Sequence, residues 1–246
     1  MAQTLASPRF DEEAVRTRGS PVPTGSLIRE DQVADDPIVV RTGSRSDTAT
    51  VALLHAEEIP EGFLSSLGAP FLTRLYRRIV KSPAAFLVVA EAVGEEDERT
   101  IGFIAGSTDV GRLYREFLWR DGLLAAGSVA RRLLPSWRQA SETLRHGVRR
   151  EGADRGAELL AVAVDPACRG RGTGRRLVRE FLREVVDRDQ DTASVVLGED
   201  NRAAWHLYEE AGFRPVRQFE LHAGRRSLVM QWTRPAPDGR GRGAQA

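Results

Sequence analysis

The sequence has a single cysteine, Cys168, and a single lysine, Lys81. One cysteine excludes a disulfide within the chain and a metal site built from several thiolates, so we expect no metal. The sequence also lacks any run of 18 apolar residues and any charged-then-apolar start, so we expect neither a membrane span nor a signal peptide. The cytoplasm is therefore the expected location.

Lysine is so scarce that arginine supplies all but one of the 36 basic side chains, against 35 acidic ones. The resulting net charge of +1 argues against a nucleic-acid partner. A bias of this kind is typical of a GC-rich coding genome. An arginine in this chain is therefore weak evidence for a phosphate ligand.

Composition divides the chain into a body and two tails. Residues 1–36 and 234–246 are rich in Ser, Pro, Gly and charge and show no apolar periodicity, which predicts disorder in both. The body, residues 37–233, is long enough to bury a real core as one domain. Within it, residues 112–150 form a long stretch that we expect to be largely helical.

The body alternates patterns of strands and helices. The predicted strands are residues 38–41, 84–93, 100–110, 158–164 and 194–198, then two that flank Gly224. The predicted helices are residues 47–58, 71–80, 177–185 and 201–211. This order predicts an α/β fold, a mixed sheet covered by helices on both faces.

A cluster of three glycines, RGRGTG at 169–174, separates the strand 158–164 from the next helix. A glycine-rich turn that opens a helix leaves backbone N–H groups free for an anion, and the helix dipole adds to the attraction. The loop lacks the Gly-Lys-Ser/Thr of a nucleotide P-loop and the acid and spacing of a Rossmann fingerprint. We expect it to bind a pyrophosphate.

Two motifs together resemble the signatures of the GNAT acetyltransferase superfamily. They are V-x-P-x-x-R-G-x-G-x-G at 164–174 and N-x-x-A-x-x-L-Y-E-x-x-G-F at 201–213. The helix and strand between them and the closing hairpin also match, and the resemblance covers about residues 38–232. It implies a mostly antiparallel sheet whose central strands splay apart, with acetyl-CoA as co-substrate.

The resemblance also implies which residues hold acetyl-CoA. The pyrophosphate would lie on Arg169, Gly170, Arg171, Gly172, Thr173, Gly174 and Arg175. Some of these glycines would need positive φ, because a Cβ would block the phosphate. Backbone groups of Val162, Ala163 and Val164 would bind the pantetheine arm like an added strand, and the Val162 N–H would stabilise the oxyanion of a tetrahedral intermediate. Asn201 would contact the arm, cap its own helix, or do both.

Tyr208 matches the family tyrosine that protonates the departing CoA thiolate, since a phenol stays protonated at neutral pH. The alternative is a tyrosine that only packs its helix. Glu158, eleven residues before Arg169, resembles in spacing a strand glutamate of histone-acetylating members that accepts the amine proton through water. Glu199 and Asp200 are alternative bases, and Glu158 could instead be a solvent-facing residue at the strand start.

Other reactive side chains are weaker candidates. Cys168 directly precedes the loop, but the family uses direct attack of the amine on the thioester, so we expect a bystander thiol. His206 lies inside the second motif and is expected at the surface, and His146 falls in the long helical stretch.

The acceptor is the least defined part of the prediction. We expect the first helices and residues 112–150 to select it, and that stretch holds nine arginines against three acidic residues. This balance favours an anionic acceptor such as a nucleotide-linked amino sugar, unless the arginines only solvate a helix pair. We therefore predict an N-acetyltransferase of a small-molecule primary amine, with no membrane partner and compatible with a homodimer. A protein or peptide N-acetyltransferase and a non-catalytic acyl-CoA-binding protein stay open.

Overall fold

The computed structural model describes residues 37–60, 63–94, 98–121, 156–221 and 225–236. The disorder expected of residues 1–36 and 237–246, the turn at Gly224 and most of the stretch 112–150 lie outside these ranges.

The described residues form one seven-stranded sheet in the order β1-β2-β3-β4-β5-β7-β6. The strands are β1 Ile38–Thr42, β2 Ala85–Val93, β3 Glu98–Ser107, β4 Ala157–Val164, β5 Thr192–Gly198, β6 Arg214–Leu221 and β7 Arg225–Thr233. All neighbours pair antiparallel except β4 and β5. The mixed, mostly antiparallel sheet is thereby confirmed.

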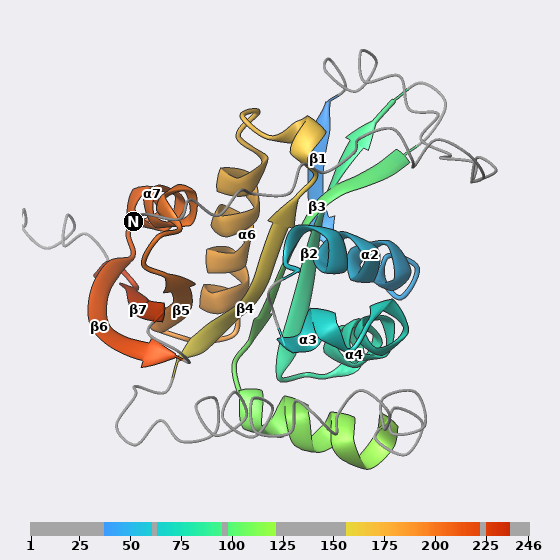
Figure 1. Ribbon diagram of the computed structural model, residues 1–246, viewed down its shortest axis with the longest axis horizontal. Coiled ribbons are helices and arrows are strands. Elements are labelled where there is room, and N and C mark those ends of the chain that lie inside the picture. Colours follow the sequence, from blue (N-terminus) through green and yellow to red (C-terminus); the bar gives the residue numbers. More distant parts are fainter. Residues whose placement is uncertain (1–36, 61–62, 95–97, 122–155, 222–224, 237–246) are drawn as a thin grey trace, which may run out of the picture.

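Helices cover both faces of this sheet, as predicted (Figure 1). They are α2 Thr48–Glu58, α3 Phe63–Ser66, α4 Ala69–Lys81, a helix over residues 110–121, α6 Thr173–Asp187 and α7 Arg202–Glu210. Figure 1 shows α2, α3 and α4 on one face and α6 on the other. The single-turn helix α3 was not predicted, because four residues are too few to show a helical period.

Two hydrophobic cores hold the layers together. The core under α6 and α7 contains Leu177 and Phe181, and the core under α2 and α4 contains Leu72, Tyr76 and Phe103, all less than 2% exposed. Each such side chain contributes about 1.5–3 kcal/mol when it leaves water. The sheet is thus fixed from both faces, and its central strands need not pair along their whole length.

The predicted strand 100–110 ends earlier in the structure, at Ser107. The Asp109 side chain accepts a hydrogen bond from the Arg112 N–H at 2.8 Å, which is the N-cap pattern that starts a helix. Val110 is therefore helical despite its β-branched side chain, because the polar cap outweighs a weak residue preference.

A partly buried ion cluster joins β1 and β2 to the start of α2. The guanidinium of Arg41 donates to both Asp47 oxygens at 2.9 Å and, through Nε, to Glu91 at 2.8 Å. Asp47 occupies the N-cap position of α2 but makes no side-chain cap. It accepts instead from the Ser44 N–H at 2.6 Å and from the Ser44 hydroxyl at 2.8 Å. Burial raises the pKa of Asp47, but the hydrogen bonds from Arg41 and Ser44 outweigh burial and lower it to about 2.

We predict that Asp47→Asn lowers the free energy of unfolding at pH 7 by about 1–3 kcal/mol, the usual worth of hydrogen bonds to a charged group. The folded-state pKa lies below the usual carboxyl pKa of 3.8, so the carboxylate stabilises the fold above about pH 4 and loses that effect as the pH falls toward 2. Urea unfolding should show the gap between variant and wild type shrinking from pH 5 to pH 3.

The matched control is Asp191→Asn. Its carboxylate is 82% exposed and lies 3.9 Å from Arg234, so its removal should change stability little at either pH. A loss in Asp47→Asn that stays constant with pH would contradict the role of the ionised carboxylate.

Candidate functional site

The two parallel strands at the centre of the sheet separate soon after they meet. β4 and β5 pair only through Ala157 with Ala193 and Glu158 with Ser194. Among the described residues, the rest of β4 pairs with no strand on its β5 side. We call this unpaired stretch the β4–β5 split. It confirms the splayed central strands that the resemblance implied.

A β-bulge lies just where the split begins. The register between β3 and β4 moves from Ala105 opposite Ala161 to Gly106 opposite Leu159, which leaves Leu160 without a partner of its own. A bulge bends its strand and shifts the following side chains to the other face. The bulge therefore lies where β4 and β5 stop pairing.

The backbone N–H and C=O groups of β4 point alternately into the split and toward β3. The Asp165 N–H donates to the Ile101 carbonyl of β3 at 2.8 Å. Because a trans peptide points its C=O opposite to its N–H, the Val164 carbonyl faces away from β3. Amides alternate along a strand, so the Val162 and Val164 N–H groups face the split and the Ala163 N–H faces β3. Two of the three predicted residues therefore direct backbone groups into the split.

The loop that follows β4 is held rigidly before its glycines. Asp165 pairs with Arg99, and its other oxygen accepts from the Ala167 N–H at 3.0 Å. That cap opens the short 3₁₀ turn Pro166–Cys168. The turn delivers the glycine cluster to one fixed place at the end of β4.

Gly170 and Gly172 have φ values of 77° and 79°, as the glycine-rich loop required. A Cβ added at either residue would meet no protein atom within 4 Å. Glycine is therefore needed there for its backbone conformation, and the space beside the loop is open to a ligand.

The start of α6 has the chemistry of an anion site. Gly172 is its N-cap residue and supplies no side-chain cap. The first-turn N–H groups, at Thr173, Gly174 and Arg175, have no helical carbonyl to bind. Free amides, the positive end of the helix dipole and an open glycine turn fit a phosphate group.

Two loop arginines are engaged with carboxylates in this structure. Arg169 pairs with Glu58 and donates through Nε to the Val164 carbonyl at 3.2 Å. Arg175 makes two hydrogen bonds to Glu210, at 2.6 and 3.0 Å. The anion-binding roles predicted for both side chains therefore require these pairs to open or to share the guanidinium.

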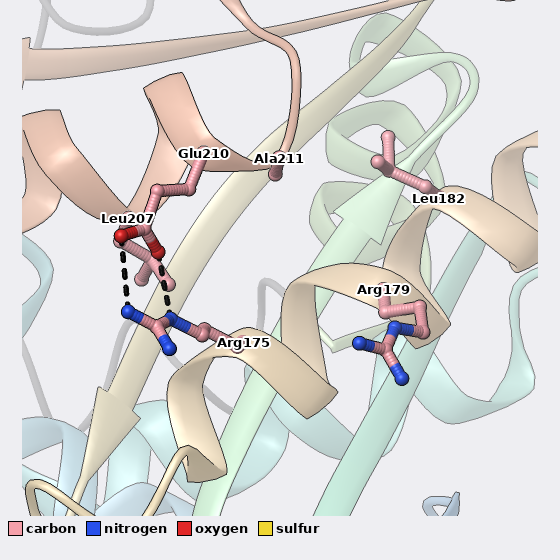
Figure 2. Close-up of a pocket in the computed structure, with 6 residues that line it drawn as sticks. All are labelled: Arg175, Arg179, Leu182, Leu207, Glu210 and Ala211. Atoms are coloured by element: carbon pink, nitrogen blue, oxygen red, sulfur yellow. Dashed lines mark hydrogen bonds and ion pairs between the residues drawn. The ribbon is translucent and has the colours of Figure 1, made fainter.

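A groove of about 410 Å³ lies between α6 and α7 beside the loop (Figure 2). Its lining residues are Arg175, Arg179, Leu182, Leu207, Glu210 and Ala211. Figure 2 shows the Arg175–Glu210 pair at one end and Arg179 apart from it. Within the described part of the chain, Arg179 has no ion-pair partner. An apolar floor with a free guanidinium can hold an anionic, partly apolar group.

Tyr208 lies in α7 and is 3% exposed, with its ring packed on Phe213 at a centroid distance of 5.6 Å. Burial raises the pKa of its phenol, so the hydroxyl stays protonated at neutral pH. No described residue hydrogen-bonds this hydroxyl, and every fully buried side-chain oxygen in the described residues has a partner. The hydroxyl therefore reaches solvent and is available as a donor.

Asn201 caps α7, because its side-chain oxygen accepts from the Ala204 N–H at 3.0 Å. The capping role is thereby confirmed. Asn201 is exposed, and its contact with a pantetheine arm stays a prediction.

Glu158 lies on the other face of the sheet from Tyr208. Its neighbours Ala157 and Leu159 belong to the core under α6 and α7, so the alternation of a strand turns the Glu158 side chain toward the α2 face. Burial raises the pKa of Tyr114, and the charge of Glu158 raises it further. Glu158 is therefore near the helix over residues 110–121. Glu199 and Asp200, the alternative bases, are exposed beyond the far end of β5.

The remaining candidate residues from the sequence are Cys168, His206 and His146. Cys168 is fully buried, and burial raises the pKa of its thiol, which suits a bystander rather than a nucleophile. His206 is exposed, as expected, and His146 lies outside the described residues. Within the described residues no group of three metal-ligating side chains occurs.

Sequence reasoning passed over His55. Its Nδ1 lies 2.5 Å from the Tyr76 hydroxyl, and its ring stacks on Phe103. Burial lowers its pKa to about 4, so the ring is neutral at physiological pH. The available signal was its position on the apolar face of α2, four residues after Val51.

No helix in the described part of the chain is long and apolar enough to cross a membrane. The sheet, its split and the uncapped loop define a class of α/β proteins in which a free strand edge and a helix N-terminus suit one elongated, anionic ligand.

Comparisons with known proteins agree with this class. A family model described as FR47-like protein matches residues 149–221. The mycothiol acetyltransferase of Rhodococcus erythropolis is 41% identical over 56 residues, 23% of this chain and 19% of that protein. The N-alpha-acetyltransferase RimI of Mycobacterium tuberculosis is 45% identical over 62 residues, 24% of this chain and 35% of that protein. The chain thus matches about a fifth and a third of these relatives' lengths.

Solved structures extend the likeness over most of the chain. The protein yncA of Salmonella typhimurium, solved with its cofactor acetyl-CoA, matches with a TM-score of 0.53 at 15% identity, over 82% of this chain and 98% of that one. The ribosomal-protein-S18-alanine N-acetyltransferase of Escherichia coli matches with a TM-score of 0.51 at 12% identity, with the same coverage. Identities this low show the fold alone. The family model, the fold and the two motifs together confirm the resemblance to the GNAT acetyltransferase superfamily.

We predict that Gly172→Val weakens CoA binding by at least about tenfold, because a β-branched residue at positive φ either strains or displaces the loop. Calorimetric titration with CoA measures the effect. Gly111→Ala, in the helix over residues 110–121, is the control, since its added Cβ comes no closer than 3.4 Å to other side chains. A folded Gly172→Val variant that binds CoA like the wild type would refute the phosphate role of the loop.

Proposed function

We propose that the protein is an acetyl-CoA-dependent N-acetyltransferase that acetylates a primary amine of a small molecule, with both substrates bound together. The observation that carries the proposal is the β4–β5 split ending at the uncapped glycine loop. Strand-edge amides and an anion site in series fit one elongated ligand with a peptide-like arm and a pyrophosphate.

The residues present fit acetyl-CoA, which supplies the activated acetyl group. Val162 and Val164 would hold the pantetheine arm through the backbone groups that they direct into the split. The loop and the first turn of α6 would hold the pyrophosphate. The groove between α6 and α7, with Arg179, adds a site for the remaining charge of the nucleotide. Asn201 stays a proposed contact for the arm.

Proton transfer would use both faces of the sheet at the split. Tyr208 would donate its phenolic proton to the departing thiolate on the α7 face. Glu158 would accept the amine proton through water on the α2 face. The division suits a direct attack, because the amine nitrogen and the thiolate sulfur are separate substituents of the tetrahedral carbon and each would meet its own proton-transfer group.

The acceptor would bind on the α2 face, where β5 has little cover. Ala193, Val195 and Leu197 face the α6 core, so Val196 points to the other face, where it is 45% exposed. An apolar strand surface near Glu158 could receive a small amine. The charge of residues 112–150 still favours an anionic one.

A protein or peptide acceptor is the second candidate, supported by the RimI relative, which is named for N-alpha-acetylation. The intact loop and Tyr208 speak against a non-catalytic acyl-CoA binder.

We further propose residues 37–233 as one GNAT domain, working in the cytoplasm where acetyl-CoA is supplied, with a homodimer as a compatible assembly. A panel of amines and N-terminal peptides, assayed for CoA release, tests the proposal. Release with none of them, despite CoA binding, would favour the non-catalytic binder.

We predict that Tyr208→Phe lowers kcat by roughly ten- to a thousandfold, near the range of a general acid, while CoA affinity stays unchanged. The substitution keeps the ring that packs on Phe213 and removes only the donor. His206→Ala, on the exposed side of the same helix, should leave kcat unchanged. An unaltered kcat in Tyr208→Phe, when chemistry limits the rate, would reduce Tyr208 to a packing residue.

We predict that Glu158→Gln lowers kcat/KM at neutral pH by roughly a hundredfold, and that the loss shrinks at high pH, where the free amine needs no base. CoA affinity should not change, because the backbone of β4 is untouched. A pH profile of kcat/KM for wild type and variant gives the answer. A loss that is constant with pH would indicate positioning only, and no loss would move the role to Glu199, Asp200 or water.

A further inference from the structure

Arg169 crosses the end of the β4–β5 split. Its Nε donates to the Val164 carbonyl at 3.2 Å. Its Nη2 pairs with the carboxylate of Glu58, the last residue of α2. The side chain of Arg169 is 57% exposed and that of Glu58 only 15%. Glu58 therefore holds a flexible arginine against one backbone oxygen.

That oxygen belongs to the free edge of β4. The Val164 carbonyl faces the split because the Asp165 N–H of the same peptide is bound to β3. A ligand that adds to β4 as an extra strand needs the carbonyls of this edge as acceptors. Arg169 thus occupies a position that such a ligand would use.

We propose that Glu58 and Arg169 form a latch that closes the end of the split and that acyl-CoA binding opens. The inference rests on the proposed function, since it takes an acyl-CoA as the ligand. Glu58 is the positioning residue, and Arg169 is the arm. The pyrophosphate competes with Glu58 for the guanidinium, and the Val164 carbonyl then becomes free for the pantetheine arm.

The strengths of the contacts allow this exchange. A half-exposed ion pair contributes little, whereas a pyrophosphate offers Arg169 more charge and several acceptor oxygens. Because Glu58 lies on α2, opening the latch also frees a carboxylate on the acceptor face. The latch therefore links the occupancy of the two substrate sites.

The test compares Glu58→Gln with Glu210→Gln. Both variants remove one negative charge that pairs with a loop arginine, but the Arg175–Glu210 pair makes no contact with the Val164 carbonyl. The dissociation constants of CoA are measured by calorimetry, and those of pantetheine, which carries no phosphate, by ligand-observed NMR. Thermal unfolding of both variants checks that they fold.

We expect Glu58→Gln to tighten pantetheine and CoA by roughly two- to fivefold, the range of a weak ion pair. Glu210→Gln should leave pantetheine unchanged and can affect CoA only through charge. If Glu58→Gln tightens only CoA, or neither ligand, the latch is wrong while the proposed function stands. A wild-type protein that binds no CoA would overturn the proposed function and the latch together.

Discussion

The central constraint in this structure is the failure of β4 and β5 to stay paired. Two parallel strands that separate after two residues leave backbone N–H and C=O groups without partners, each at a cost of about 1–3 kcal/mol if kept from water. The fold offsets that cost with two separate cores, one on each face of the sheet. The bulge at Leu160 lies where the two strands stop pairing.

Function follows from where the split lies. Its open end meets the glycine loop, so a strand edge and a helix N-terminus follow one another, as the proposed ligand requires. Tyr208 and Glu158 lie on opposite faces of the sheet, and in the proposed function this would separate the proton donor from the proton acceptor. The geometry therefore supports a transfer between two bound substrates more directly than simple binding of one.

Much of this arrangement could be predicted from the sequence. The apolar run before the loop, the three glycines and the amphipathic helix after them predicted β4, the anion site and α6. The positive φ expected for some of the loop glycines is found at Gly170 and Gly172, and the cap by Asn201 was one of the two roles expected for that residue. These features depend on neighbours in the chain, which is why a residue pattern is enough to predict them.

Other features depend on residues that are distant in the sequence. The Arg169–Glu58 pair joins residues that are 111 positions apart, and the His55–Tyr76 pair joins residues that are 21 positions apart. No local sequence pattern predicts such contacts. The end of β3 was mispredicted because one hydrogen bond, which Asp109 accepts from the Arg112 N–H, decided between strand and helix. The bulge at Leu160 was also missed, since a run of apolar residues looks the same with or without it.

The most direct test of the account is residue-resolved amide hydrogen exchange with and without CoA. The account predicts that CoA slows exchange at Val162 and Val164 and at the first turn of α6. The Ala163 amide, already directed to β3, should change little. Binding of CoA with no protection at Val162 and Val164 would show that the ligand does not use the β4–β5 split, and would contradict the central claim.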